Sequence, residues 1–400
     1  MLVARGVAAK AAFLFERLHI FAANGFRRRG LWLVDIANAG VDITQTEVFR
    51  AADIVHLHWV NQGFLSLSGL QRIIDSGKPV VWTLHDLWPV TGICHHPGSC
   101  EGYVSTCHDC PLLQRPSRWD LSARVFARKA ELYGRGRIHF VAVSSWTAEM
   151  ARRSALLGCN SIDVIPNALP TDIFCPGNKT EARRGLGLPE GKSIIAFGAA
   201  RIDEPAKGLD KLYEAIGMLR REDMHLVLFG DVKDGSRPEG SPCETTYLGN
   251  VTDPKQLCSI YRAADVLVNA SDFETFGQTL AEAQACGCVP VSFDRGGQRD
   301  IISHLHDGYL AHSGDVADLA SGIAWALNEP PSAEVLRAKA MRFSDDSVAR
   351  QYIALYEGYL ESLEGLEGLK GLESLEGLEG LKPQASATNL PTSLNLLKPL

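Results

Sequence analysis

The sequence predicts an α/β protein built from two doubly wound domains, each a parallel sheet covered by helices. Short apolar runs recur along the chain and alternate with helix-like segments, which is typical of buried parallel strands joined by crossover helices. The length of 400 residues is enough for two separate cores. A stretch rich in Pro, Gly and Asn divides these runs into two sets, so we expect the interdomain connection at residues 169–192.

The apolar runs fall into two series. Those of the first half are 53–60, 79–86, 138–145 and 162–168. Those of the second half are 192–201, 224–231, 245–251, 264–271, 288–294 and 307–315. They predict domains over residues 1–168 and 193–345, followed by a helix at 346–362 that packs back on the first domain. From Leu360 to Leu381 leucine recurs at every third residue among glycines, which forms no fixed apolar stripe, so 363–400 is predicted to be a low-complexity tail.

Composition and charge exclude some functions. The formal net charge of -7 gives no support to a nucleic-acid partner, and no apolar run is long enough for a transmembrane helix, so we expect a cytoplasmic protein. Lys10, Glu16 and Arg17 interrupt the apolar N-terminal stretch, unlike a signal peptide. That stretch and the following basic residues 27–29 have two interpretations: a surface helix packed on its domain, or a peripheral anchor at the inner face of the cell membrane.

The stretch "ASDFETFGQTLAEAQACGCVPVSFDRGG", residues 270–297, places two acids around the start of a helix. Glu274 lies in the turn after a strand, and Glu282 lies about one turn into the helix. Eight helical residues span about 12 Å, so the two acids can hold different parts of one elongated ligand but cannot share a proton or a metal. The backbone amides of Phe276, Gly277 and Gln278 lie near the helix N-terminus, which favours a phosphate group.

With its flanks, "LGNVTDPKQLCSIYRAADVLVNASDFETFGQTLAEAQACGCVPVSFDRGG" resembles the C-terminal domain of family-4 retaining glycosyltransferases of the GT-B fold. In that fold two Rossmann-like domains face each other across a cleft, and the resemblance covers most of residues 50–350. It implies transfer of a sugar from a nucleotide-diphosphate donor to a saccharide acceptor. It also implies that Glu282 holds the ribose, that Glu274 holds the donor sugar, and that the amides at 276–278 meet the sugar or the diphosphate.

The segment "FGAARIDEPAKGLDKL" carries two cations at places where the family neutralises the donor diphosphate, Arg201 and Lys207. The departing nucleoside diphosphate is negatively charged, and fixed cations stabilise that charge in the transition state. No Asp-x-Asp motif is present, so catalysis is expected to need no cofactor. Gly230 ends another strand, where it either lets the backbone approach the nucleotide or is an ordinary strand-ending glycine.

The block "VVWTLHDLWPVTGICHHPGSCEGYVSTCHDCPLL" carries two signals. His85 closes a strand, and the resemblance implies that it contacts the donor sugar near the reacting carbon; the alternative is a structural histidine at a strand end. Four cysteines follow at spacings that suit one tetrahedral structural zinc, with neighbouring histidines as substitutes, and the alternatives are two disulfides or separate thiols. These cysteines are Cys94, Cys100, Cys107 and Cys110.

The same block resembles a subset of family-4 enzymes from bacterial exopolysaccharide and lipopolysaccharide clusters. That resemblance implies a role in polysaccharide biosynthesis, and we expect a lipid-linked saccharide as the acceptor. No obvious nucleophile is placed to form a glycosyl-enzyme intermediate, so front-face attack is the expected retaining mechanism. The opening strand and Gly-Gly loop usual in the family are missing before "MLVARGVAAK". Either the recorded start is late or the first domain is trimmed, and this departure supports one alternative, an inactive GT-B protein that binds a sugar nucleotide or a partner. A separate alternative is an epimerase acting on a sugar nucleotide.

Overall fold

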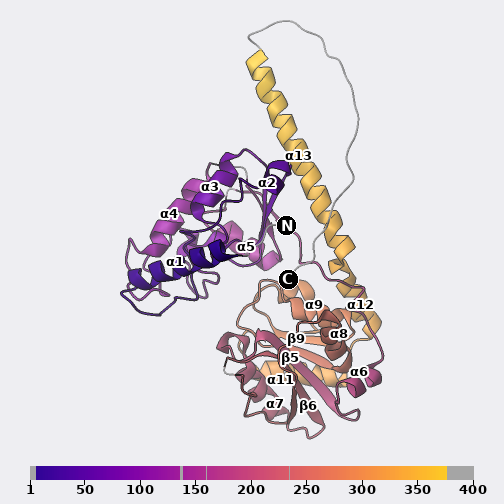
Figure 1. Ribbon diagram of the computed structural model, residues 1–400. Coiled ribbons are helices and arrows are strands. Elements are labelled where there is room, and N and C mark those ends of the chain that lie inside the picture. The colour runs from indigo at the N-terminus through magenta and orange to yellow at the C-terminus, as the bar shows by residue number, and fades with distance from the viewer. Residues whose placement is uncertain (1–5, 136–137, 159, 234, 376–400) are drawn as a thin grey trace. The chain divides into compact units, whose positions relative to one another are not determined.

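The computed structural model describes residues 6–135, 138–158, 160–233 and 235–375, with side chains up to 362. The chain separates into two compact units (Figure 1). The first contains residues 1–81, 108–138 and 350–400, and the second contains residues 82–107 and 139–349. Two segments of the first half of the sequence, 82–107 and the part that begins at 139, therefore belong to the second unit.

In the first unit, polar side chains cap the N-termini of the helices. Ser66 accepts a hydrogen bond from the Gly69 amide at the start of one helix, and Asp120 caps another through the Ser122 and Ala123 amides. These helices are α1 (Val7–Ala23), α2 (Glu47–Ala51), α3 (Leu67–Asp75), α4 (Leu121–Tyr133) and α13 (Asp345–Leu375).

The C-terminal helix α13 contacts the first strand of the chain, β1 (Val55–Leu57). The His56 Nδ1 atom lies 2.5 Å from the Tyr356 hydroxyl, and the His56 ring also lies against Tyr352, with 5.2 Å between ring centroids. The helix continues beyond residue 362 to Leu375, so the first part of the predicted tail is helical. The rest of that predicted tail, 376–400, lies outside the described residues.

A four-stranded sheet has the order β1-β2-β3-β4. Every residue of β2 is buried, as expected for a strand covered on both faces, and β3 pairs in parallel with β4. The other strands of this sheet and the short helices that follow them are β2 (Val80–Leu84), η1 (Trp88–Val90), η2 (Gly102–Val104), β3 (Ile138–Ala142), α5 (Ser145–Arg153) and β4 (Ile162–Val164).

The second unit is built on a six-stranded parallel sheet with the order β10-β9-β8-β5-β6-β7. Its strands are β5 (Ser193–Arg201), β6 (Met224–Asp231), β7 (Glu244–Tyr247), β8 (Val266–Asn269), β9 (Val289–Phe293) and β10 (Tyr309–Ala311). The order of the strands reverses between β5 and β8. Ligands of doubly wound sheets bind at the carboxyl ends of the strands at such a point. The predicted α/β class is confirmed.

Helices cover both faces of this sheet (Figure 1). Along β5, Ile194 and Ala196 contribute to the core beneath α8 and α9, whereas Ile195 and Phe197 contribute to the core beneath α7 and α11. The covering helices are α6 (Lys179–Gly185), α7 (Leu209–Leu219), α8 (Pro254–Ala263), α9 (Gln278–Ala285), α11 (Val316–Asn328) and α12 (Ala333–Ala340). The shorter elements are η3 (Pro205–Lys207), α10 (Gln298–Ile301) and η4 (Met341–Phe343).

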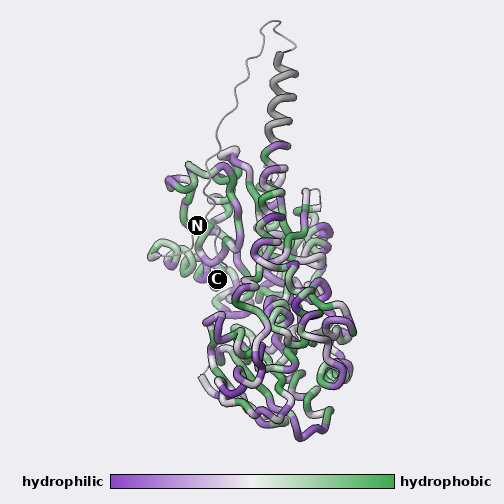
Figure 2. Tube along the Cα trace, turned by 90° about the vertical axis from the view of Figure 1, so that its right-hand side faces the viewer, coloured by the Kyte–Doolittle hydropathy of each residue, from purple (hydrophilic) through white to green (hydrophobic). Residues whose placement is uncertain are grey.

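Apolar and polar residues alternate along the chain in both units (Figure 2). Within the described part of the chain, none of the helices combines the length and the apolar character that crossing a bilayer requires.

Candidate active site

The predicted site lies where β5 and β8 end, at the point where the strand order reverses. Glu274 follows β8, and its Oε1 atom accepts a hydrogen bond from the Lys207 Nζ at 3.0 Å and from the Asn269 side chain at 3.4 Å. Asn269 is buried, whereas Lys207 and Glu274 are partly exposed. Lys207 and Glu274, which come from two separate sequence motifs, are therefore in direct contact.

Lys207 is fixed by the close approach of two loops. Gly208 has a φ of 75°, and a Cβ on it would lie 2.2 Å from the Ala270 carbonyl oxygen. No other residue type fits that position without moving the backbone. The Asp272 amide also donates to the Ala206 carbonyl at 2.9 Å. The turn that carries Lys207 is therefore held against the end of β8.

The backbone around Glu274 is held from several sides. Its carbonyl accepts a hydrogen bond from the Gly297 amide at 2.8 Å. The Thr275 carbonyl accepts from the hydroxyl of Ser144 at 2.6 Å and from that of Thr147 at 3.2 Å. The Thr275 hydroxyl donates in turn to the His85 carbonyl at 3.0 Å. Glu274 is thus placed where the chain segments after β2, β3 and β9 converge.

His85 is one of these neighbours, and its ring is largely neutral. Burial lowers the pKa of His85, while the charge of Asp86 and a side-chain hydrogen bond with Asn167 oppose that shift. A neutral imidazole can donate through one ring nitrogen and accept through the other. The His85 backbone is thus hydrogen-bonded to the turn that carries Glu274. Contact between the His85 ring and a sugar stays a prediction.

The N-terminus of α9 follows that turn directly. Gly277, with a φ of 103°, precedes the first helical residue, Gln278, and the buried Phe276 packs edge-on against Phe343 with 5.3 Å between ring centroids. The first amides of a helix have no carbonyl one turn before them, so they suit an anion. The amides at 276–278 therefore lie directly after Glu274 in the chain and at the start of α9, and their binding of a phosphate stays a prediction.

Glu282 lies further along α9 in a different environment. Its Oε2 atom accepts a hydrogen bond from the hydroxyl of the buried Tyr261 at 2.8 Å. Burial raises the pKa of Glu282 to about 7, although hydrogen bonds from Tyr261 and Gln278 oppose the shift. The two predicted acids therefore differ: Glu274 is paired with a cation, whereas Glu282 is bonded to neutral groups.

Arg201 and Gly230 have local partners. The Arg201 guanidinium binds the Asp203 carboxylate at 3.0 Å, and both line a hollow of about 360 Å³ together with Lys233. Gly230 is needed for packing, because a Cβ there would lie 1.9 Å from the Ala199 carbonyl oxygen. The structure therefore joins Lys207 to Glu274 and joins Arg201 to Asp203. The approach of Gly230 to a nucleotide stays a prediction.

Sequence reasoning missed His96 as a residue of this site. Its ring stacks on Phe273 with 4.0 Å between centroids, and its buried Nδ1 has no hydrogen-bond partner among the described residues. Burial lowers the pKa of His96 to about 4, and the charges of Glu274 and Lys207 are among the smaller influences. In the sequence His96 lies two residues after Cys94, which made it an alternative zinc ligand. Nothing local indicated that it would meet residue 273.

The four cysteines predicted to hold zinc lie around η2 and the loops on either side of it. Cys107 Sγ accepts a hydrogen bond from the Gly92 amide at 3.3 Å, and Cys110 is buried. Across the described residues, no three or more His, Cys, Asp and Glu side chains converge in an arrangement that could hold a metal ion. The zinc site stays a prediction, and the zinc content of the purified protein tests it.

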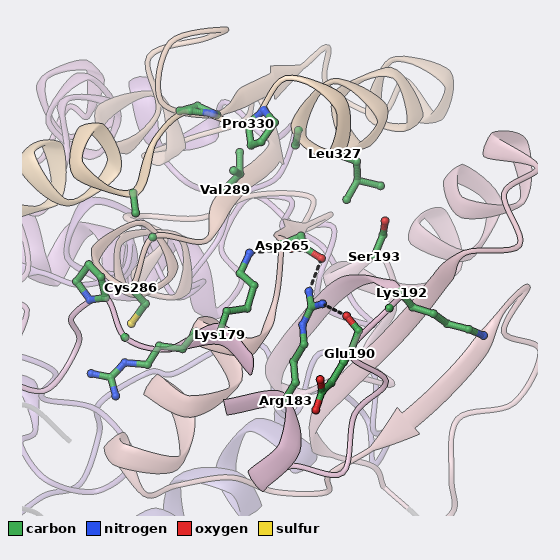
Figure 3. A pocket seen from close by; sticks show the side chains of 18 residues that line it. Lys179, Arg183, Glu190, Lys192, Ser193, Asp265, Cys286, Val289, Leu327 and Pro330 are labelled. Atoms are coloured by element: carbon green, nitrogen blue, oxygen red, sulfur yellow. Dashed lines mark hydrogen bonds and ion pairs between the residues drawn. The ribbon is translucent and has the colours of Figure 1, made fainter. Parts of the chain in front are cut away.

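A larger pocket, of about 510 Å³, lies at the opposite edge of the same sheet (Figure 3). Its lining includes Ser193 and Val289, which begin strands, so it lies at amino ends. Its cations already have partners, since Arg183 binds the Asp265 carboxylate at 2.7 Å and Lys179 binds the same carboxylate at 2.7 Å. These bonds attach α6 to the sheet, and we assign the pocket no catalytic role.

Two protein-family models match the chain. The model described as "Glycosyl transferases group 1" matches residues 178–343, and "Glycosyltransferase Family 4" matches residues 3–173. The chain is 34% identical over 214 residues to a D-inositol 3-phosphate glycosyltransferase of Segniliparus rotundus, covering 50% of this chain and 47% of that protein. It is 30% identical over 331 residues to a D-inositol 3-phosphate glycosyltransferase of Acidothermus cellulolyticus, covering 77% of this chain and 67% of that protein. The chain thus spans about half the length of the first relative.

Solved structures share the fold. A sucrose-phosphate synthase of Thermosynechococcus elongatus matches with a TM-score of 0.60 at 20% identity, covering 78% of this chain and 74% of that one. The Anabaena protein HepE, solved in complex with UDP-glucose, matches with a TM-score of 0.55 at 18% identity, covering 78% and 79%.

Proposed function

Because the chain belongs to the group 1 glycosyltransferases and has their GT-B fold, we propose that it transfers a sugar from a nucleotide-diphosphate donor to a saccharide acceptor, with retention of configuration and without a catalytic metal. The observation that carries this proposal is the Lys207–Glu274 pair at the carboxyl edge of the sheet, beside the N-terminus of α9. The cation and the helix amides suit the negatively charged diphosphate of such a donor, and the carboxylate suits the hydroxyl groups of its sugar.

The donor diphosphate would lie at the start of α9. Its charge grows as the sugar leaves, so groups that bind it more tightly in the transition state accelerate the reaction. Lys207 is held in place there, and Arg201 is available if the diphosphate replaces Asp203 as its partner. Glu282 would hold the ribose, with Tyr261 fixing its orientation.

The donor sugar would lie between Glu274 and His85. Glu274 can accept hydrogen bonds from two hydroxyl groups, and the half-buried His96 offers a buried ring nitrogen, Nδ1, without a partner among the described residues. In front-face transfer, the acceptor oxygen bonds the anomeric carbon on the face from which the phosphate oxygen departs. The acceptor proton passes to that departing oxygen, so the products are the glycoside and the nucleoside diphosphate.

The acceptor proposed from the sequence is a lipid-linked saccharide in exopolysaccharide or lipopolysaccharide synthesis. A second candidate comes from the relatives, several of which are named D-inositol 3-phosphate glycosyltransferases. An inositol phosphate is also a polyol, but it adds a phosphate that would need cations of its own. The two candidates therefore differ in charge at the acceptor position.

Two measurements test the proposal. A thermal-shift screen of UDP, GDP and ADP sugars identifies the donor, since a ligand that binds only the folded state raises the melting temperature. Transfer from that donor is then measured with inositol phosphate and with lipid-linked saccharides. Glu274→Ala should lower kcat/KM for transfer about 100-fold, whereas Glu214→Ala, which removes an exposed acid on α7, should leave it unchanged. Donor binding without transfer to any acceptor would favour the inactive alternative, and a changed sugar without acceptor would favour the epimerase.

A further inference from the structure

Helix α1 is charged on its buried side and apolar on its exposed side. The side chains of Glu16 and Arg17 are buried together with Ile20. On the other side lie exposed residues with small or large apolar side chains, which we call the apolar stripe: Val7, Ala11, Leu14, Phe15, Leu18 and Ala22. At 3.6 residues per turn these positions share a face about 100° wide, which is the width of a face that normally packs against something.

Hydrogen bonds fix the helix in this orientation. Glu16 Oε1 accepts from the amides of Ile36 and Ala37 at 2.7 and 2.6 Å, and Arg17 donates to the Val34 carbonyl at 2.9 Å and binds Asp35. Turning the stripe inward would break these bonds and leave buried backbone groups unsatisfied. The apolar stripe therefore stays exposed while α1 remains packed in its own unit.

The loop after α1 extends this exposed apolar surface. Phe26, Trp32 and Leu33 all have large exposed side chains, with 71%, 67% and 54% of their surface accessible. Part of the loop is ordered by hydrogen bonds, since Asn24 donates to the Arg29 carbonyl at 2.8 Å and Arg29 donates to the Pro111 carbonyl at 3.0 Å. Exposed aromatic side chains of this kind are enriched where proteins meet a bilayer surface.

The exposed charges on α1 and on the loop after it have one sign. Lys10, Arg27, Arg28 and Arg29 are exposed, whereas Glu16, the one acid between residues 6 and 33, is buried. A protein partner or a second copy would have to supply acids to match these cations. A bilayer that contains anionic lipid supplies negative charge and an apolar layer together.

We propose that the apolar stripe, the exposed side chains at 26, 32 and 33, and the basic residues at 27–29 bind the surface of an anionic phospholipid bilayer. The stripe enters the boundary between headgroups and acyl chains, and the arginines bind lipid phosphates. The inference does not depend on the proposed transfer reaction, because it concerns binding and not turnover.

Sedimentation of the full chain with vesicles tests this inference. We expect the protein to sediment with vesicles of phosphatidylcholine mixed with phosphatidylglycerol, to remain in solution with phosphatidylcholine alone, and to be released by salt. Arg27→Gln combined with Arg28→Gln should lower the partition coefficient about 30-fold, from roughly fivefold for each arginine. Leu14→Ser and Leu18→Ser should each lower it at least about tenfold.

A matched pair of tryptophans gives the control. Trp32 belongs to the proposed surface and is 67% exposed, whereas Trp119 is 72% exposed and lies at the start of α4. Trp32→Ser should weaken vesicle binding and Trp119→Ser should not, with unchanged circular dichroism for both. Equal effects of the two changes, no sedimentation with anionic vesicles, or sedimentation unaffected by the stripe variants would overturn the proposal. A dimer that becomes a monomer in Leu14→Ser would assign the stripe to a second copy of the chain instead.

Discussion

The ammonium group of Lys207 lies 3.0 Å from the carboxylate of Glu274, and the two residues come from loops 67 positions apart in the sequence. Their side chains are 29% and 21% exposed. An ion pair of this exposure adds little to folding stability, because solvent screens it. Its position between the ends of β5 and β8 is better explained by a ligand that both groups bind.

Lys207→Ala and Glu274→Ala should therefore separate stability from activity. We expect each change to alter the free energy of unfolding by less than about 1 kcal/mol. Each should lower kcat/KM for sugar transfer by about 100-fold, since it removes a charged contact to the donor. Urea unfolding and initial-rate kinetics on the same preparations measure the two effects. A large stability loss with unchanged kcat/KM per folded molecule would make the pair structural.

Much of this arrangement follows from local sequence pattern. Each predicted apolar run overlaps a strand of the structure, and the turn with Glu274 followed by an amide-rich helix start was predicted from "SDFETFGQ". Local pattern also predicted a helix near the N-terminus, where α1 lies, and a helix at 346–362, which lies within α13. These features depend on residues near one another in the sequence, so periodicity and capping signals are sufficient to find them.

The remaining features depend on contacts between distant segments. The stacking of His96 on Phe273 and the bonding of Glu282 to Tyr261 join segments that only the folded chain brings together. The sequence predicted that Arg201 lies at the end of a strand. It did not predict the ion pair with Asp203, because that pair depends on the conformation of the two side chains. Helix α6 lies within the predicted interdomain connection, where Asn178 caps it and Arg183 attaches it to Asp265.

The stacked pair of His96 and Phe273 should affect donor binding. The Nδ1 atom of His96 is buried and has no hydrogen-bond partner among the described residues. A sugar hydroxyl that donates a hydrogen bond to this atom would satisfy it. His96→Ala should raise KM for the donor about tenfold, the value of one hydrogen bond near 1.4 kcal/mol. His312→Ala, at an exposed position, is the control. If both variants have the donor KM of the unaltered protein, His96 does not contact the donor.

Glu282 should make stability depend on pH. The pKa of Glu282 is about 7 in the folded chain against 4.5 for an unperturbed glutamate, so between these two pH values the folded form holds a proton that the unfolded chain has released. The free energy of unfolding should therefore fall as pH rises from 4.5 to about 7 and become level above that range. In Glu282→Gln this fall should be smaller, leaving the variant more stable above pH 7 by up to about 3 kcal/mol.

Urea unfolding of both proteins over that pH range measures this effect. Tyr261 can donate to a glutamine oxygen as it does to the carboxylate, so the substitution keeps the local hydrogen bond. Glu214→Gln on α7, an exposed position, should leave the pH profile unaltered. Parallel profiles for Glu282→Gln and the unaltered chain would show that Glu282 is ionised throughout, contrary to the effect of its burial.

Gly208 and Gly217 form a matched pair for the turn that carries Lys207. Alanine at Gly208 would place its Cβ 2.2 Å from the Ala270 carbonyl oxygen at a φ of 75°, whereas a Cβ at Gly217, inside α7, meets nothing within 4 Å. Gly208→Ala should destabilise the fold by about 2 kcal/mol or more, by strain and displacement of the loop. Gly217→Ala should stabilise it by about 0.5–1 kcal/mol, because alanine favours a helix.

Activity distinguishes the two glycines further. In Gly208→Ala the loop must move away from the end of β8, which carries Lys207 away from Glu274, so kcat/KM should fall even at temperatures where the variant is fully folded. In Gly217→Ala the transfer rate should be unchanged. Thermal unfolding and initial rates on the two variants give both quantities. If folded Gly208→Ala retains the full rate, the position of Lys207 relative to Glu274 does not matter for transfer, and the ion pair loses its proposed role.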